Sequence, residues 1–170
     1  MLSIVPLLAG GGLYETGAGG SAPKHVQQFV EEGHLRWDSL GEYLATAVAF
    51  KQLGKTSNNS KAEALGDCLN KAVGRILNNR KSPSRRVKEI DNRATNFYVA
   101  LYWAEYLAEV DPAYKPIFED LSTNRSKIVE EFKQCQGDPV DLGGYYMFDF
   151  VKAHESMNPS PTLSNILQYE

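Results

Sequence analysis

Apolar residues recur every three or four positions along most of the chain, which is the spacing of amphipathic helices. The same spacing predicts helices over residues 23–32, 39–53, 92–110, 123–134 and 161–169, with a short piece over 113–120. At most one or two strands are expected, near residues 2–8 and around Val140. We therefore expect a mainly α-helical fold. The clearest helix starts with a capping-box pattern at residues 60–63 and continues with Leu65, Cys68, Leu69, Ala72, Val73, Ile76 and Leu77.

Residues that favour helix ends mark the boundaries of these segments. Gly33 and Gly54 are placed to end the first two helices. Asp38 or Ser39 is placed to cap the second helix, whose apolar face would comprise Leu40, Tyr43, Leu44, Ala47 and Val48. Ser160 precedes a proline and should cap the last helix.

The segment 92–110 is the richest in aromatic residues. Its neighbouring positions are also apolar, so the aromatic rings are expected to pack in the core rather than form a platform for stacking bases. The aromatic residues are Phe97, Tyr98, Tyr102, Trp103 and Tyr106.

The composition fits one globular domain. A chain of 170 residues with 42% hydrophobic residues can bury a core without a metal or a disulfide. A net charge of −3 argues against binding to nucleic acid or to an anionic membrane. The two cysteines, Cys68 and Cys135, do not have the spacing of metal ligands and are expected to be buried thiols in a reducing compartment. His34 and His154 match no site pattern and are expected to be exposed.

A glycine-rich stretch, residues 10–20, contains six glycines in eleven positions. It cannot be a regular helix, and it leads into Pro23, which suits the first position of one. Free N–H groups at that helix start, with the nearby cations Lys24 and His25, would favour an anion such as a phosphate. The alternative is a surface loop that only connects two elements.

A second unusual segment, residues 80–88, is the most basic in the chain. Five of its nine residues are Lys or Arg, and Pro83 interrupts it. On composition alone, a solvated loop between two helices explains it.

The sequence resembles a known enzyme family at several points. Residues 20–25, with Glu15 upstream, resemble the adenosine-binding loop of the β-decarboxylating dehydrogenases. Over nearly the whole chain, the resemblance is to the C-terminal portion of the monomeric-type NADP-dependent isocitrate dehydrogenases. The matching segments are 3–7, 35–42, 81–85, 89–93, 97–104 and 140–146, whereas residues 147–156 depart from the family pattern.

The resemblance implies a single segment, residues 1–170, that carries a cofactor loop at 10–25 and a helical bundle at 26–170. This would be the helical part of an isocitrate/isopropylmalate dehydrogenase-like α/β fold. The implied cofactor is NADP. Its 2′-phosphate and adenosine contacts would fall on His25, Arg36 and Arg85, with Asp38 and residues Ser21 to Lys24 lining the same pocket.

Each of these residues also has a simpler explanation. His25 could be a polar residue on the first turn of a helix, and Arg36 could pair with Glu32 at helical spacing. Arg85 could be one surface charge among several, and its neighbour Arg86 could reach the phosphate instead.

The groups needed for catalysis are not apparent in the sequence. Oxidative decarboxylation of isocitrate requires a divalent cation held by carboxylates, an acid and a base, and arginines for the substrate. The resemblance implies that these groups, with the ligands of Mg²⁺ or Mn²⁺, lie outside this chain. We therefore expect no catalytic or metal-binding residues here.

The implied partners are NADP, isocitrate and the remainder of the dehydrogenase, with no nucleic acid and no membrane. The implied compartment is the cytoplasm, or the mitochondrial matrix in a eukaryote. Two other hypotheses remain at this point. One is a free-standing helical domain, derived from the enzyme, that binds a nucleotide or a protein without catalysis. The other is a purely structural helical module.

Overall fold

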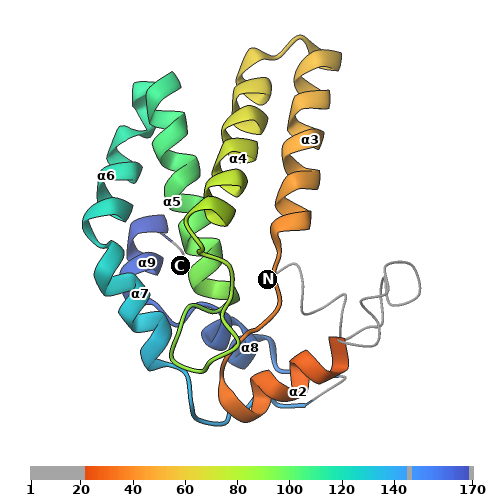
Figure 1. Ribbon diagram of the computed structural model, residues 1–170, viewed down its shortest axis with the longest axis vertical. Helices are drawn as coiled ribbons and strands as arrows, with labels where there is room; N and C mark the ends of the chain where they lie inside the picture. The colour runs from red at the N-terminus through yellow and green to blue at the C-terminus, as the bar shows by residue number, and fades with distance from the viewer. Residues whose placement is uncertain (1–21, 145–146, 169–170) are drawn as a thin grey trace.

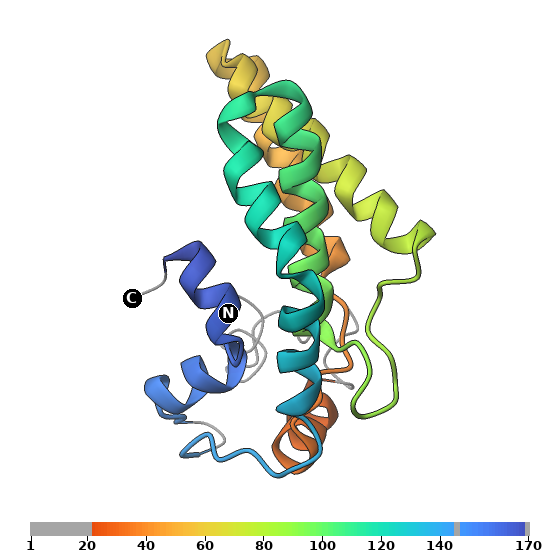
Figure 2. The ribbon, with the colours of Figure 1, turned by 90° about the vertical axis from the view of Figure 1, so that its left-hand side faces the viewer.

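The computed structural model describes residues 22–144 and 147–168, and every regular element within these ranges is helical. The strand expected near residues 2–8 lies outside them. Two tiers are visible in Figures 1 and 2: the long helices α3, α4 and α5 rise together with α6, while α2 and α8 lie at the opposite end. The helices are α2 (Ala22–Glu32), α3 (Leu40–Ser57), α4 (Ser60–Asn78), α5 (Asn92–Val110), α6 (Lys115–Thr123), α7 (Arg125–Gln134), α8 (Phe150–Met157) and α9 (Pro161–Leu167), with a 3₁₀ turn, η2 (Pro112–Tyr114), before α6.

Helix α5 lies at the centre of the larger core. Phe97, Tyr98 and Tyr102 are buried there, which confirms the expectation that these rings pack inside. Trp103 is half-buried and donates its Nε1–H to the Leu65 carbonyl of α4 at 3.0 Å. The boundaries of α5 agree with the predicted helix 92–110, because the Asp91 side chain caps its start and Asp111 precedes Pro112 at its end.

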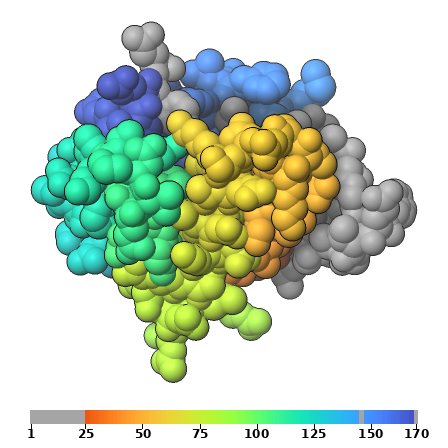
Figure 3. Space-filling model, turned by 90° about the horizontal axis from the view of Figure 1, so that it is seen from above, coloured from red at the N-terminus to blue at the C-terminus, as the bar shows by residue number. Residues whose placement is uncertain are grey.

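Helices α3 and α4 form a hairpin that differs from the prediction in two ways. Helix α3 passes through Gly54 and ends at Ser57, so the prediction that Gly54 ends this helix was wrong. A Cβ at Gly54 would lie 2.8 Å from the backbone nitrogen of Glu63, so the glycine permits close helix contact. Leu44 and Val48, predicted to face the core, are 41% and 66% exposed. Figure 3 shows this hairpin beside the α5 and α6 pair.

Side chains cap the starts of several helices. Asp38 or Ser39 was expected to cap α3: Ser39 takes the cap position without a side-chain hydrogen bond, and Asp38 accepts one from the backbone N–H of Leu40 at 2.6 Å. Asn59, rather than Ser60, caps α4. Ser160 caps α9 as predicted.

The C-terminal part contains a helix that the sequence patterns did not predict. Helix α8 follows Asp149, whose carboxylate accepts hydrogen bonds from the two backbone N–H groups of Val151 and Lys152. The strand expected around Val140 is not formed in the described part of the chain. Instead, the Val140 N–H donates one hydrogen bond to the Val30 carbonyl, at 2.8 Å, and the segment runs along α2.

A smaller core joins α2 to this C-terminal part. Val26 and Phe29 of α2 pack with Leu35, Leu142 and residues Ala153 and Met157 of α8. Both cysteines are free thiols, as expected, but only Cys68 is fully buried, whereas Cys135 is half-buried. None of the helices in the described ranges is long and apolar enough to cross a membrane.

A buried ion pair lies where α2, α5 and α8 meet. The side chains of Arg93 and Asp91 are 3% and 0% exposed, and Nη2 of Arg93 lies 2.7 Å from Oδ2 of Asp91. Arg93 also donates to the carbonyls of Gly33 and Ser156, each at 2.6 Å, and its guanidinium lies 5.4 Å from the Phe29 ring centroid. One arginine therefore connects the ends of α2 and α8 to the start of α5.

Two glycines of α4 provide a matched test of helix packing. A Cβ at Gly66 would lie 2.6 Å from the Ala47 carbonyl oxygen, whereas a Cβ at Gly74 would meet nothing within 4 Å. We expect Gly66→Ala to lower the free energy of unfolding by about 1–3 kcal/mol. Gly74→Ala should raise it by up to about 1 kcal/mol, because alanine has the higher helix propensity. Urea unfolding of both variants would check this, and equal effects would contradict the close contact.

The buried ion pair gives a second prediction. Arg93→Met would leave the Asp91 carboxylate buried without its cation, so we expect a loss of about 3–5 kcal/mol in the free energy of unfolding. Lys51→Met, which breaks the exposed pair between Lys51 and Asp67, should cost less than about 1 kcal/mol. Urea unfolding would measure both values. A small effect of Arg93→Met would show that the pair is not needed for stability.

Candidate cofactor site

Several of the predicted cofactor residues lie on or beside residues 33–39, which connect α2 to α3. This connecting segment crosses the start of α5, where Asn92 donates its Nδ2 hydrogens to the Trp37 carbonyl and the Ser39 hydroxyl, both at 2.9 Å. The backbone N–H of Asn92 also donates to the Leu35 carbonyl at 2.9 Å. The connecting segment is therefore fixed to the most buried helix of the fold.

His25 lies on the first turns of α2, beside the connecting segment. Its ring makes an edge contact with the Trp37 indole, with centroids 6.0 Å apart and planes at 72°. The indole Nε1 of Trp37 is buried and has no hydrogen-bond partner within the described ranges. A buried donor of this kind is uncommon in folded proteins.

Arg36 has two partners. Its Nη1 lies 2.5 Å from Oε2 of Glu32, so the pair considered above is present, although α2 ends at Glu32 and Arg36 lies beyond the helix. Its Nε donates to the Arg85 carbonyl at 3.0 Å, which joins the connecting segment to the basic loop. Neither contact uses Nη2. The Arg36 side chain is 16% exposed, against 41% for Glu32, so the guanidinium is held in place by well-defined neighbours.

The basic loop, residues 80–91, folds back on itself. The Ser84 N–H donates to the Ile90 carbonyl at 2.7 Å, and the Ser84 hydroxyl accepts from the Arg86 N–H at 3.1 Å while donating to the Glu89 carboxylate. The side chains of Arg85 and Arg86 are both exposed. The loop therefore presents two adjacent guanidinium groups to solvent next to Arg36.

The structure brings together only some of the predicted residues. His25, Arg36 and the backbone of Arg85 lie in one region, although they come from three separate segments. The described contact of Asp38 is with the start of α3. Ser21 and the side chain of Lys24 lie outside the described part of the chain, so the structure does not place them.

Two residues in this region were not anticipated from the sequence. His34 was expected to be exposed, but it is fully buried, with its ring nitrogens at 2.7 and 2.8 Å from two oxygen atoms. One of these belongs to Gln136, at the end of α7, whose side chain is also buried. Since the two residues are 102 positions apart, no local pattern could reveal this contact.

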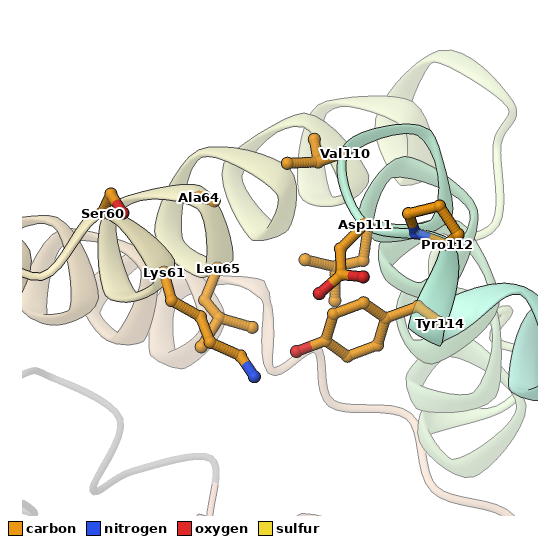
Figure 4. Close-up of a pocket in the computed structure, with 9 residues that line it drawn as sticks. Ser60, Lys61, Ala64, Leu65, Val110, Asp111, Pro112 and Tyr114 are labelled. Atoms are coloured by element: carbon orange, nitrogen blue, oxygen red, sulfur yellow. The ribbon is translucent and has the colours of Figure 1, made fainter.

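Two hollows lie outside this region. One of about 380 Å³ lies between the start of α4 and the end of α5, where Lys61 and Tyr114 face each other across an apolar floor that includes Leu65 (Figure 4). It lies at the end of the bundle opposite α2. A second of similar volume is lined by Lys81, Arg125, Lys133 and two tyrosines. In the described ranges, no group of three or more His, Cys, Asp or Glu side chains could hold a metal ion.

Comparison with known proteins agrees with the resemblance noted in the sequence. The family model of monomeric isocitrate dehydrogenase matches residues 1–168. The chain is 53% identical over 173 residues to an NADP isocitrate dehydrogenase of Azotobacter vinelandii, which covers 98% of this chain and 23% of that protein. It is 50% identical over 173 residues to NADP isocitrate dehydrogenase 2 of Colwellia maris, with the same coverage.

A third relative gives a similar result. NADP isocitrate dehydrogenase 2 of Mycobacterium tuberculosis is 49% identical over 174 residues, which cover 99% of this chain and 23% of the relative. The chain thus spans about a quarter of the length of these curated relatives. Because the family model matches nearly every residue, the chain belongs to the monomeric isocitrate dehydrogenase family.

Proposed function

We propose that this chain is the C-terminal segment of an NADP-dependent isocitrate dehydrogenase and supplies the part of the cofactor site that binds the adenosine 2′-phosphate. The relatives are named NADP isocitrate dehydrogenases, and the chain corresponds to about a quarter of their length. The single segment would contain the cofactor segment at residues 10–25, whose last four residues begin α2, and the helical bundle that follows.

The contact between Arg36 and the Arg85 carbonyl is the observation that carries this proposal. A 2′-phosphate has nearly two negative charges at neutral pH and is best recognised by guanidinium groups with directed donors. Arg36 offers Nη2, and the loop offers the exposed side chain of Arg85 or Arg86, at or next to the contacted carbonyl. His25 and the buried Nε1 of Trp37 would supply further polar atoms.

The start of α2 supports the same assignment. This helix has eleven residues and starts at Ala22, directly after the glycine-rich loop. Its first backbone N–H groups lack partners within the helix and lie at the positive end of the helix dipole, which favours an anion. Ser21 and Lys24 would line this end of the pocket, and Asp38 would border it from the start of α3.

The segment would contribute binding and discrimination rather than bond-making. Bound NADP would supply the acceptor for a hydride from C2 of isocitrate. The residues that hold isocitrate and Mg²⁺ or Mn²⁺ would belong to the remainder of the dehydrogenase, which is the proposed partner of this segment. We propose a cytoplasmic location, by analogy with the bacterial relatives.

Arg36 provides the main test. Arg36→Ala in the complete polypeptide removes a charge-assisted contact to the 2′-phosphate, worth about 1.5–3 kcal/mol, so NADP affinity should fall roughly 10–150-fold. NAD lacks this phosphate, and its affinity should change less than about threefold. Titration of both cofactors, followed by calorimetry, would measure the effect, with the exposed Arg125→Ala as the control. Equal losses of affinity for NADP and NAD would contradict the assignment of Arg36 to the 2′-phosphate.

The basic loop provides a separate test. Because Arg36 holds the carbonyl of residue 85, we expect Arg85 rather than Arg86 to reach the phosphate. Arg85→Ala should weaken NADP binding by roughly tenfold or more, whereas Arg86→Ala should change it less than about threefold. The same titrations would compare these adjacent substitutions. The opposite order would assign the contact to Arg86.

A further inference from the structure

The basic loop carries Arg85 and Arg86, and most of its basic side chains are exposed. Arg80, Arg85, Arg86 and Lys88 all lie at the surface. An exposed loop of this kind would lose backbone freedom on binding a ligand, at a cost of about 1–2 kcal/mol for each residue that becomes ordered. A site built on it therefore needs contacts that order the loop in advance.

His34 supplies one such contact from the connecting segment. Its side chain is fully buried, and its Nε2 lies 2.8 Å from the Ser84 carbonyl oxygen. Two positions along, Arg36 donates to the next carbonyl, that of Arg85. Two side chains of the connecting segment thus hold two consecutive carbonyl groups of the loop.

Gln136 holds the other side of the loop from the end of α7. Its Oε1 accepts from the Lys88 N–H at 2.7 Å, and its Nε2 donates to the Glu89 carbonyl at 3.1 Å. Nε2 also donates to the Phe132 carbonyl at 2.8 Å. Because one end of the amide faces a donor and the other faces two acceptors, its orientation is fixed by its neighbours.

The two sets of contacts are linked to each other. Oε1 of Gln136 lies 2.7 Å from Nδ1 of His34, and both side chains are at most 1% exposed. The adjacent Gly137 N–H donates to the Glu32 carbonyl at 2.7 Å, which joins the end of α7 to the end of α2. The amide of Gln136 therefore connects the loop directly to the segment that carries Arg36.

We infer that Gln136 is a positioning residue that increases selectivity for NADP over NAD. This inference rests on the function proposed above. It holds residues 84–89 in a fixed position beside Arg36. Arg85 can then contact the 2′-phosphate without a further loss of backbone freedom in the loop. Loss of this contact raises the ordering cost of NADP binding, while NAD, which has no 2′-phosphate to engage the loop, avoids that cost. His34 acts with Gln136 by bridging it to Ser84.

The test compares the same substitution, glutamine to leucine, at two positions that are two residues apart. In the complete polypeptide, Gln136→Leu removes the contacts to the loop. Gln134→Leu instead changes an exposed residue of α7 whose Nε2 donates to the Glu130 carboxylate at 3.4 Å. Gln136→Leu should weaken NADP binding roughly tenfold and NAD binding less than about twofold. Hydrogen exchange at the amides of residues 84–90 should become faster. Gln134→Leu should change none of these values.

A second comparison separates positioning from general destabilisation. Gln136→Leu leaves buried polar groups without partners and will lower Tm. Leu121→Ala makes a cavity in the larger core, and Leu121 is not among the residues that hold the loop. At a similar loss of Tm, Leu121→Ala should leave the ratio of NADP to NAD affinity unchanged. A similar fall in that ratio would overturn the inference.

The outcomes distinguish this inference from the proposed function. If Arg36→Ala weakens NADP selectively but Gln136→Leu weakens both cofactors equally or neither, the function stands and the positioning role is wrong. Unchanged hydrogen exchange in residues 84–90 would also overturn that role. If Arg36→Ala weakens NADP and NAD equally, both the function and the positioning role fail.

Discussion

The ion pair between Arg93 and Asp91 is the interaction on which the cofactor end of the molecule depends. Burying two charges is costly unless each is paired and its remaining polar atoms are hydrogen-bonded. Here Arg93 also meets the carbonyls of Gly33 and Ser156, while Asp91 caps the start of α5. The pair thus combines charge compensation with a junction between three helices.

The neighbouring segments are attached at this junction. Asn92 follows Asp91 directly and fixes the backbone of Trp37 and Leu35, which flank Arg36. The basic loop ends at the same Asp91. Two segments that are about fifty residues apart in the chain are therefore held to one helix start, and this explains how Arg36 and Arg85 come into contact.

Much of the helical framework followed from the sequence because its signals are local. The Asp-Pro step after Val110 indicated the end of α5, and the structure adds the Asp91 side chain as the cap of its predicted start. The prediction at Gly54 was wrong because a glycine within a helical pattern resembles a helix end. The close contact with α4, which explains this glycine, is visible only in the folded structure. Helix α8 escaped prediction because its most apolar residues, Phe150 and Val151, are exposed, and the small Ala153 is buried instead.

The candidate site was predicted in a different way. Arg36 and Arg85 came from the family resemblance, whereas His25 was also indicated locally by its place at a helix start after the glycine-rich stretch. The pairing of Arg36 with Glu32 was visible from helical spacing and is present. Burial of His34 depends on Gln136, far along the chain, so it required the folded structure.

The pairing of Arg36 with Glu32 also bears on what an arriving phosphate encounters. The charge of the Arg36 guanidinium is offset by the Glu32 carboxylate, whereas the nearby Arg85 and Arg86 side chains are exposed. On the proposed function, a phosphate must share Arg36 with Glu32 or displace it. Anions that bind the guanidinium more weakly than the Glu32 carboxylate would not displace it. Glu32 would therefore increase the selectivity of Arg36 for a doubly charged phosphate.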